Sequence, residues 1–139
     1  MTISDRQKEL IEEFSIFEDW MEKYEYIIDL GKDVEGVKEE DKSEDNLVRG
    51  CQSRVWLVPS FEEGKLHFEA DSDAIITKGI VGMVVRVLSD STPQEILDSE
   101  LFFVDQIGLK EHLSPTRSNG LVSMIKKIKT YALVYSAKA

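Results

Sequence analysis

The sequence predicts an α+β fold in which a small, three-stranded antiparallel sheet is covered by helices from both termini. Apolar residues recur at helical spacing in residues 4–30 and from residue 74 onward, whereas residues 46–71 are rich in β-forming residues and turn signals. A chain of 139 residues is long enough to bury one core. We therefore expect a single domain that spans residues 1–139.

The N-terminal segment is predicted to form two helices. Ser4 and Gln7 have the spacing of a capping box, and a short amphipathic helix follows them. A second helix is expected over residues 17–30, with Gly31 as its C-terminal cap. Residues 32–45 are polar and aperiodic, so we interpret them as a surface connection. The apolar stripe of the second helix comprises Phe17, Trp20, Met21, Tyr24, Ile27 and Ile28.

The middle of the chain is predicted to form the sheet as an antiparallel meander. Residues 46–49, 54–61 and 66–71 are the three strand candidates, because they carry β-branched and aromatic residues or alternate between apolar and polar ones. A turn at residues 50–53 and a hairpin connection at residues 62–65 would join them.

A helix over residues 74–88 is expected to form the centre of the core, because it is apolar on nearly every face. Asp71 or Ser72 would cap its N-terminus. Gly79 and Gly82 lie inside this helix, so we interpret them as points of close backbone approach. A phosphate-binding loop would instead precede the helix.

Helices are also predicted in the C-terminal part of the chain. One begins at Pro93 with Thr92 as its cap, and another ends at Gly108. The last helix begins at Ser114 or Ser118. Its apolar stripe comprises Leu121, Met124, Ile125, Ile128, Ala132 and Tyr135.

Charge and composition exclude several classes of function. The net charge is −10, and residues 1–45 carry the acidic excess, which argues against a nucleic-acid binder because phosphate contacts need a basic stripe. We interpret the acidic residues as solvated helix faces, with steering of a basic partner as the alternative. No apolar run approaches the ~18 residues of a membrane helix, and the N-terminus lacks signal-peptide features. We therefore expect a cytoplasmic protein without membrane contacts.

Cys51 is the single cysteine and the strongest nucleophile of the chain, and it lies in the turn at residues 50–53, outside any apolar run. Arg49 and Arg54 are close in sequence, and nearby cations favour the thiolate, which is the nucleophilic form. From the residues alone, a reactive thiol and a structural, buried thiol both remain open.

The two histidines do not decide the chemistry. His67 is expected on the outward face of a strand and His112 between two helices, so a cysteine hydrolase, which needs an imidazole at the thiol, is a minor alternative. Cys51 and these histidines are too scattered for the ligands of a metal site. Asp73 is interpreted as part of a helix cap. Arg117 is interpreted as a surface cation that would stabilise a thiolate if the fold brought the two together.

Four blocks of residues occur in a recognisable order along the chain. They are Val48-Arg49-Gly50-Cys51-Gln52-Ser53 with Val55-Trp56-Leu57, Ala70-Asp71-Ser72-Asp73-Ala74 with Lys78-Gly79, Thr92-Pro93-Gln94-Glu95-Ile96, and Gly108-Leu109 with His112-Leu113-Ser114-Pro115, Arg117 and Asn119-Gly120-Leu121. Each block alone is weak evidence, but the cysteine turn and the late Ser-Pro-x-Arg sequence are specific together. In this combination the chain resembles the SufE family over nearly its whole length.

The resemblance implies a SufE-like fold and a function in iron–sulfur cluster assembly. It implies that Cys51 accepts persulfide sulfur from a pyridoxal-phosphate-dependent cysteine desulfurase of the SufS or CsdA type, stimulates that enzyme and passes the sulfur toward a cluster scaffold. Pyridoxal phosphate belongs to the partner, and no cofactor or metal is implied for this chain. The other residues that it implicates are Gly50, Gln52 and Ser53 in the cysteine loop, and Asp73 and Arg117 near that loop or against the desulfurase.

Two alternatives to a sulfur carrier are kept. The chain is either an activator that stimulates the desulfurase without carrying sulfur, or a stand-alone cysteine-dependent enzyme. The first predicts that Cys51→Ser keeps the stimulation, and the second requires a histidine near Cys51.

Overall fold

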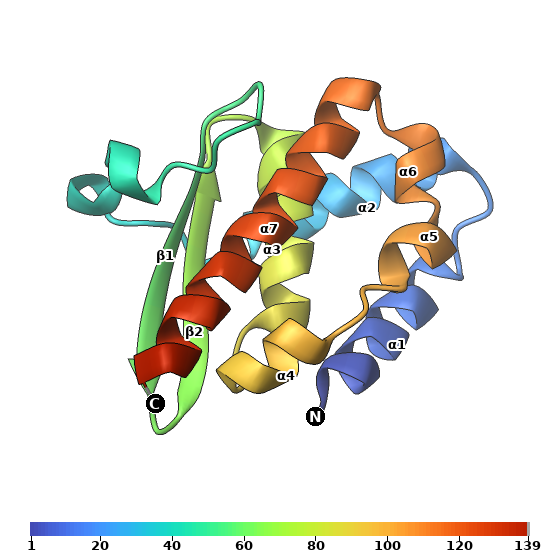
Figure 1. Ribbon diagram of the computed structural model, residues 1–139. Helices are drawn as coiled ribbons and strands as arrows, with labels where there is room; N and C mark the ends of the chain where they lie inside the picture. Colours follow the sequence, from blue (N-terminus) through green and yellow to red (C-terminus); the bar gives the residue numbers. More distant parts are fainter. Residues whose placement is uncertain (139) are drawn as a thin grey trace.

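The computed structural model describes residues 1–138, and this part of the chain forms seven α-helices, a β-hairpin and two short 3₁₀ turns. Figure 1 shows the hairpin at one side, with α7 crossing α3 beside it and α1, α2, α5 and α6 on the other side. The elements are α1 (Ile3–Phe14), α2 (Trp20–Lys32), η1 (Glu39–Asp41), η2 (Glu44–Asn46), β1 (Val55–Glu62), β2 (Lys65–Ser72), α3 (Ile75–Leu88), α4 (Pro93–Asp98), α5 (Phe103–Ile107), α6 (Leu109–His112) and α7 (Pro115–Lys138).

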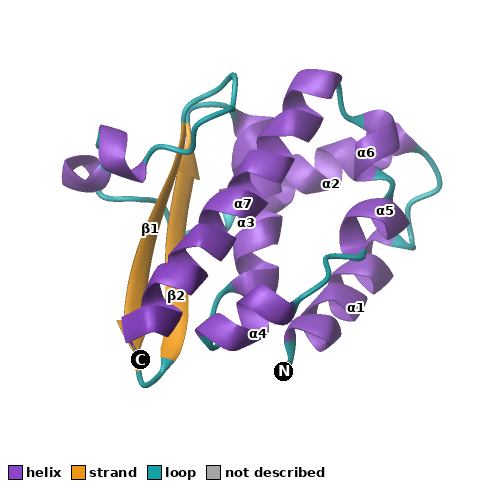
Figure 2. Cartoon of the chain, viewed as in Figure 1, coloured by secondary structure: helices purple, strands orange, loops and turns teal. Residues whose placement is uncertain are grey.

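The sheet in residues 1–138 contains two strands, so the prediction of three strands is wrong. β1 and β2 pair antiparallel over their full length, and they are the two strands drawn in Figure 2. The third candidate, residues 46–49, contributes only an isolated bridge between Leu47 and Trp56. Its first residue, Asn46, belongs to η2, and Lys127 Nζ donates to the carbonyls of Asp45 and Leu47 at 3.3 Å. Lys127 thus binds these carbonyls in place of a neighbouring strand. The chain turns at residue 50, so the segment before the turn is too short to form a third strand.

α3 occupies the centre of the core, as its all-round apolar sequence predicts. Nine of its 14 residues are buried, and α2, β2 and α7 pack around it. Gly79 makes the close contact with α2, since a Cβ there would overlap the carbonyl of Ile27. Gly31 faces the backbone of Gly79 from inside α2. The prediction that Gly31 caps α2 is therefore wrong, because this glycine is needed where the two helices cross.

The start of α1 differs from the prediction. Thr2 is the cap, and Asp5 completes the capping box with two hydrogen bonds of 3.1 Å. Gln7 is instead buried. Its side chain donates to the carbonyl of Glu100 at 3.0 Å and accepts from the amide of Phe103 at 3.1 Å, so it joins α1 to the start of α5.

The starts of α2 and α3 also differ. α2 begins at Trp20, with the Asp19 side chain as its cap. α3 begins after Ala74 and has no side-chain cap. Asp71 and Ser72 do not cap it because β2 extends to Ser72, so both residues belong to the strand end.

Three later helix boundaries lie where the sequence predicts, whereas the short helix α6 is not predicted, because His112, expected between two helices, is its last residue. Thr92 caps α4, and Glu95 completes a capping box around Pro93. Gly108, in a left-handed conformation, ends α5, and α7 begins at Pro115.

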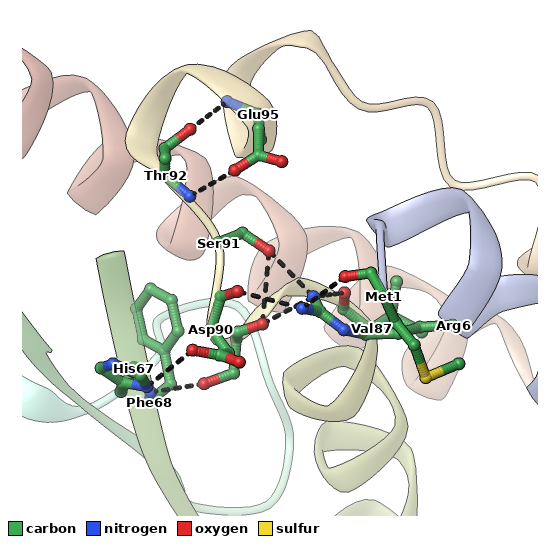
Figure 3. A network of polar contacts seen from close by, with 10 residues as sticks. Met1, Arg6, His67, Phe68, Val87, Asp90, Ser91, Thr92 and Glu95 are labelled. Atoms are coloured by element: carbon green, nitrogen blue, oxygen red, sulfur yellow. Dashed lines mark hydrogen bonds and ion pairs between the residues drawn. The ribbon is translucent and has the colours of Figure 1, made fainter. Parts of the chain in front are cut away.

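Arg6 ties α1 to the connection between α3 and α4 (Figure 3). Its guanidinium donates to the carbonyls of Val87, Ser89 and Asp90 and to the hydroxyl of Ser91, over distances between 2.7 and 3.1 Å. A cation is favourable at this position, because the last carbonyls of a helix carry partial negative charge. The end of α3 is thereby fixed to the first helix.

Candidate functional site

The cysteine loop, residues 49–54, lies at the end of the molecule where β2 ends and where α3 and α7 begin (Figure 1). Gly50 turns the loop with a φ of +92°, a value that glycine adopts without strain. A Cβ at this position would also overlap the hydroxyl of Ser123 in α7. Glycine therefore allows the loop to lie directly against α7.

Cys51 is half-buried, and its sulfur points toward α7. The thiol donates a weak hydrogen bond to the carbonyl of Gly120, with Sγ 3.6 Å from the oxygen. A Cβ at Gly120 would lie only 3.3 Å from Sγ. Because residue 120 has no side chain, the sulfur of Cys51 can pack directly against α7.

A cavity of about 80 Å³ adjoins Cys51. A single water needs on the order of 10–15 Å³ of such space, so the cavity has room for additional atoms on the sulfur. Its lining comprises Cys51, Gln52 and Ser53 from the loop, Ala74, Ile76, Thr77 and Ile80 from the start of α3, and Thr116, Arg117, Gly120 and Met124 from α7.

Burial raises the pKa of the Cys51 thiol, because a thiolate loses solvation there. The prediction that the neighbouring arginines favour the thiolate is therefore wrong for this conformation. Arg49 lies instead 3.4 Å from the carboxylate of Glu44, and Arg54 is exposed. The thiol is kept protonated, and hence weakly nucleophilic, while it remains buried.

Asp73 holds the end of the cysteine loop and does not line the cavity. Its Oδ1 accepts from the amide of Arg54 at 3.0 Å, and its own amide donates to the carbonyl of Arg54 at 3.2 Å. The hydroxyl of Ser72 donates to the same carbonyl at 2.8 Å. Three hydrogen bonds thus anchor residue 54 to the end of β2.

Arg117 lies in the first turn of α7, where it lines the cavity and is exposed to solvent. Its guanidinium is 5.9 Å from the centre of the Tyr24 ring, within reach of a cation–π interaction. The fold thus brings a cation to the mouth of the Cys51 cavity from a position 66 residues away in the sequence.

Neither histidine lines the Cys51 cavity. His67 Nδ1 lies 3.8 Å from the carboxylate of Asp90 at the far end of β2. His112 stacks on Trp20, with ring centres 4.6 Å apart. A cysteine hydrolase would need an imidazole at the thiol, so this geometry does not support that alternative.

Two further expectations concern absent features. Among residues 1–138, no group of His, Cys, Asp and Glu side chains is arranged to hold a metal ion. Within the same residues, no helix is both long and apolar enough to cross a membrane. The absence of a metal or cofactor and the cytoplasmic location remain predictions.

Seven residues of the cavity lining were not assigned to the site from the sequence, and three of them illustrate which signals were present. Thr77 had a signal, because it is a polar residue in a helix that was expected to form the centre of the core, and the fold buries it. Gly120 also had one, because glycine in a helix interior is unfavourable and needs a reason. Met124 had none, because its place in the apolar stripe of α7 is equally consistent with ordinary core packing.

Comparisons with known proteins agree with this architecture. Residues 8–132 match the family model described as "SufE: Fe-S metabolism associated domain". The solution structure of a hypothetical protein from Thermus thermophilus is similar, with a TM-score of 0.75 and 19% sequence identity over 93% of this chain and 94% of that chain. At this identity the structural similarity shows the fold alone, whereas the family match covers most of the sequence.

Proposed function

The chain belongs to the SufE family, a family associated with iron–sulfur metabolism, and on this basis we propose that it is a sulfur acceptor. Cys51 takes persulfide sulfur from a pyridoxal-phosphate-dependent cysteine desulfurase of the SufS or CsdA type. The chain stimulates that enzyme and passes the sulfur on to an iron–sulfur cluster scaffold. Its part is that of a cytoplasmic carrier without a cofactor of its own, and pyridoxal phosphate belongs to the desulfurase.

The observation that carries this proposal is the position of Cys51. The only cysteine of the chain lies in a loop, beside a cavity with room for additional sulfur. A persulfide is easily reduced or oxidised, so a carrier needs to shield it between donor and recipient. A buried structural thiol would need neither a loop nor an adjoining cavity.

The proposed transfer is a thiol–persulfide exchange. The Cys51 thiol releases its proton to solvent, and the resulting thiolate attacks the outer sulfur of the desulfurase persulfide. A new S–S bond forms at Cys51 while the S–S bond of the donor breaks, and the donor cysteine leaves as a thiolate. One sulfur atom moves and no net oxidation occurs.

We infer that the half-buried conformation, in which the pKa of Cys51 is raised, is a resting state. Transfer requires the cysteine loop to move Cys51 toward solvent, where the thiol ionises more readily. The anchors at the two ends of the loop allow this movement. The amide of Val48 donates to the carbonyl of Val55 at 2.7 Å, and Arg54 is held by Asp73. β1 and β2 can therefore stay paired while residues 49–53 swing outward.

The test is the intact mass of the protein after incubation with a cysteine desulfurase and cysteine. We expect wild type to gain one or more sulfur atoms that reductant removes, and Cys51→Ser to gain none. Cysteine turnover by the desulfurase is measured in the same samples. Faster turnover without added sulfur would overturn the carrier proposal in favour of an activator. No added sulfur and no faster turnover would contradict both.

A further inference from the structure

A second cavity, of about 240 Å³, lies between α5, α6 and α7. We call it the α5–α7 groove. Its lining is mainly apolar, and Val122 at its surface is 45% exposed although it lies next to buried Leu121. The apolar side chains in the lining are Leu101, Val104, Leu121, Val122 and Ile125.

The groove lies on a different face of α7 from the Cys51 cavity. Arg117, Gly120 and Met124 line the Cys51 cavity, whereas the residues one position further along, Ser118, Leu121 and Ile125, line the groove. One residue corresponds to a rotation of about 100° around a helix. A partner in the groove would therefore leave the cysteine loop free to move.

Two lysines stand at the groove, Lys110 and Lys126. Lys126 is exposed, and its side-chain ammonium has no hydrogen-bond or ion-pair partner within the described residues. Its neighbours differ in this respect, because Lys127 binds the carbonyls of residues 45 and 47, and Lys129 binds the carbonyl of Ser99. The charged group of Lys126 is thus available to a partner.

The charge around α7 differs from that of the whole chain. The net charge is −10, yet residues 112–139 contain no aspartate or glutamate. The acidic residue that lines the groove is Asp105, which lies 3.9 Å from Lys110. Because Asp105 offsets the charge of Lys110, the charged residues of the lining leave one excess positive charge, on Lys126, and a docked segment meets a positively charged groove.

We propose that the α5–α7 groove binds an acidic amphipathic helix of a partner protein. Small-molecule sites usually enclose roughly 300–1,000 Å³, whereas this groove suits a few apolar side chains from one face of a helix. Carboxylates beside those side chains would face Lys126 and Lys110. The proposal goes beyond sulfur acceptance and does not depend on Cys51.

The test uses two synthetic helical peptides with the same leucine face, one with glutamates on its flanks and the other with lysines. Binding is measured by NMR, from the methyl signals of Val104, Val122 and Ile125. We expect the glutamate peptide to shift these signals and to bind about tenfold more tightly than the lysine peptide. Equal binding of the two peptides, shifts confined to another surface, or no binding at about 1 mM peptide would overturn the proposal.

Variants of α7 provide a matched control. Val122→Asp places a carboxylate in the groove and should weaken binding of the glutamate peptide at least tenfold, because the new charge is desolvated and faces like charges. Val134→Asp changes a valine of the same helix that is 46% exposed and lies outside the groove, and it should leave the affinity unchanged. Lys126→Glu should weaken binding about fivefold. Thermal unfolding checks that both valine variants are folded. If both are folded and weaken peptide binding equally, the assignment of the binding site to the α5–α7 groove is contradicted.

Peptide binding requires neither sulfur nor a desulfurase. A failure of this test therefore leaves the proposed role of Cys51 untouched, and a failure of sulfur loading leaves the groove untouched.

Discussion

Residues 89–92, between α3 and α4, and the cysteine loop, residues 49–54, are short connections at opposite ends of the hairpin, and they are held in different ways. Arg6 binds the first connection through its carbonyls and a hydroxyl. The hairpin adds further bonds, from the amide of Asp90 to the carbonyl of Leu66 at 2.7 Å and from the amide of Leu66 to the carbonyl of Ser91 at 2.8 Å. Nearly every residue of this segment has a hydrogen-bond partner.

The cysteine loop is bound mainly at its ends. Within the described residues, residues 49–53 form no backbone–backbone hydrogen bond of normal length. Between the anchors at Val48 and Arg54, the loop is held by the weak thiol bond of Cys51, the packing of Gly50 on Ser123 and the 3.4 Å contact of Arg49 with the exposed carboxylate of Glu44. Segments with few buried hydrogen bonds open at low free energy without unfolding the core. The fold therefore concentrates its stabilising hydrogen bonds away from the thiol.

The largest effect is expected from removing the Arg6 network. Arg6→Ala leaves several partly buried carbonyls without a donor, so the free energy of unfolding should fall by about 3 kcal/mol. Urea denaturation measures this loss. Lys8→Ala, an exposed change in the same helix, should stay within about 0.5 kcal/mol of wild type. Similar values for the two variants would mean that the network does not hold the connection.

A smaller effect is expected from releasing one end of the cysteine loop. Asp73→Ala removes the acceptor for the amide of Arg54. A lost hydrogen bond of about 1 kcal/mol corresponds to an opening of the loop that is about fivefold more frequent. Iodoacetamide should therefore alkylate Cys51 about fivefold faster. Asp73→Asn keeps the side-chain oxygen and should react close to the wild-type rate. If both variants react like wild type, residue 54 is not what restrains the loop.

The smallest effect is the pH dependence of stability that comes from the buried thiol. Burial raises the pKa of Cys51 in the folded state. The protonated thiol therefore contributes stability that is fully present below the unfolded pKa, near ~8.5, and is lost as the pH rises through the folded pKa. Wild type should therefore lose stability relative to Cys51→Ser as the pH rises above about 8.5. A constant difference between the two proteins above this pH would contradict burial of the thiol.

Short segments show where sequence reasoning succeeded and where it failed. The long helix at the centre was predictable because nearly every face of it is apolar, and Pro93 and Pro115 mark helix starts by local geometry alone. Residues 46–49 have the composition of a strand, but Lys127 of α7 donates to the carbonyl of Leu47. Gln7 has capping-box spacing, but its amide is used at the start of α5. In both cases the competing partner is distant in the sequence, and composition carries no information about it.

By itself, the sequence determined the α+β class, the buried central helix and a single cysteine in a turn, because helical period, turn residues and charge balance are local properties. The motifs around that cysteine were also sufficient to indicate the family. The protonation state of the thiol, in contrast, depends on the packing of distant segments. α7 presents Gly120 to the sulfur and Arg117 to the mouth of the cavity, and the resulting burial raises the pKa that the neighbouring arginines were expected to lower. Desolvation depends on atoms brought together from distant parts of the chain, and these contacts exist only in the folded protein.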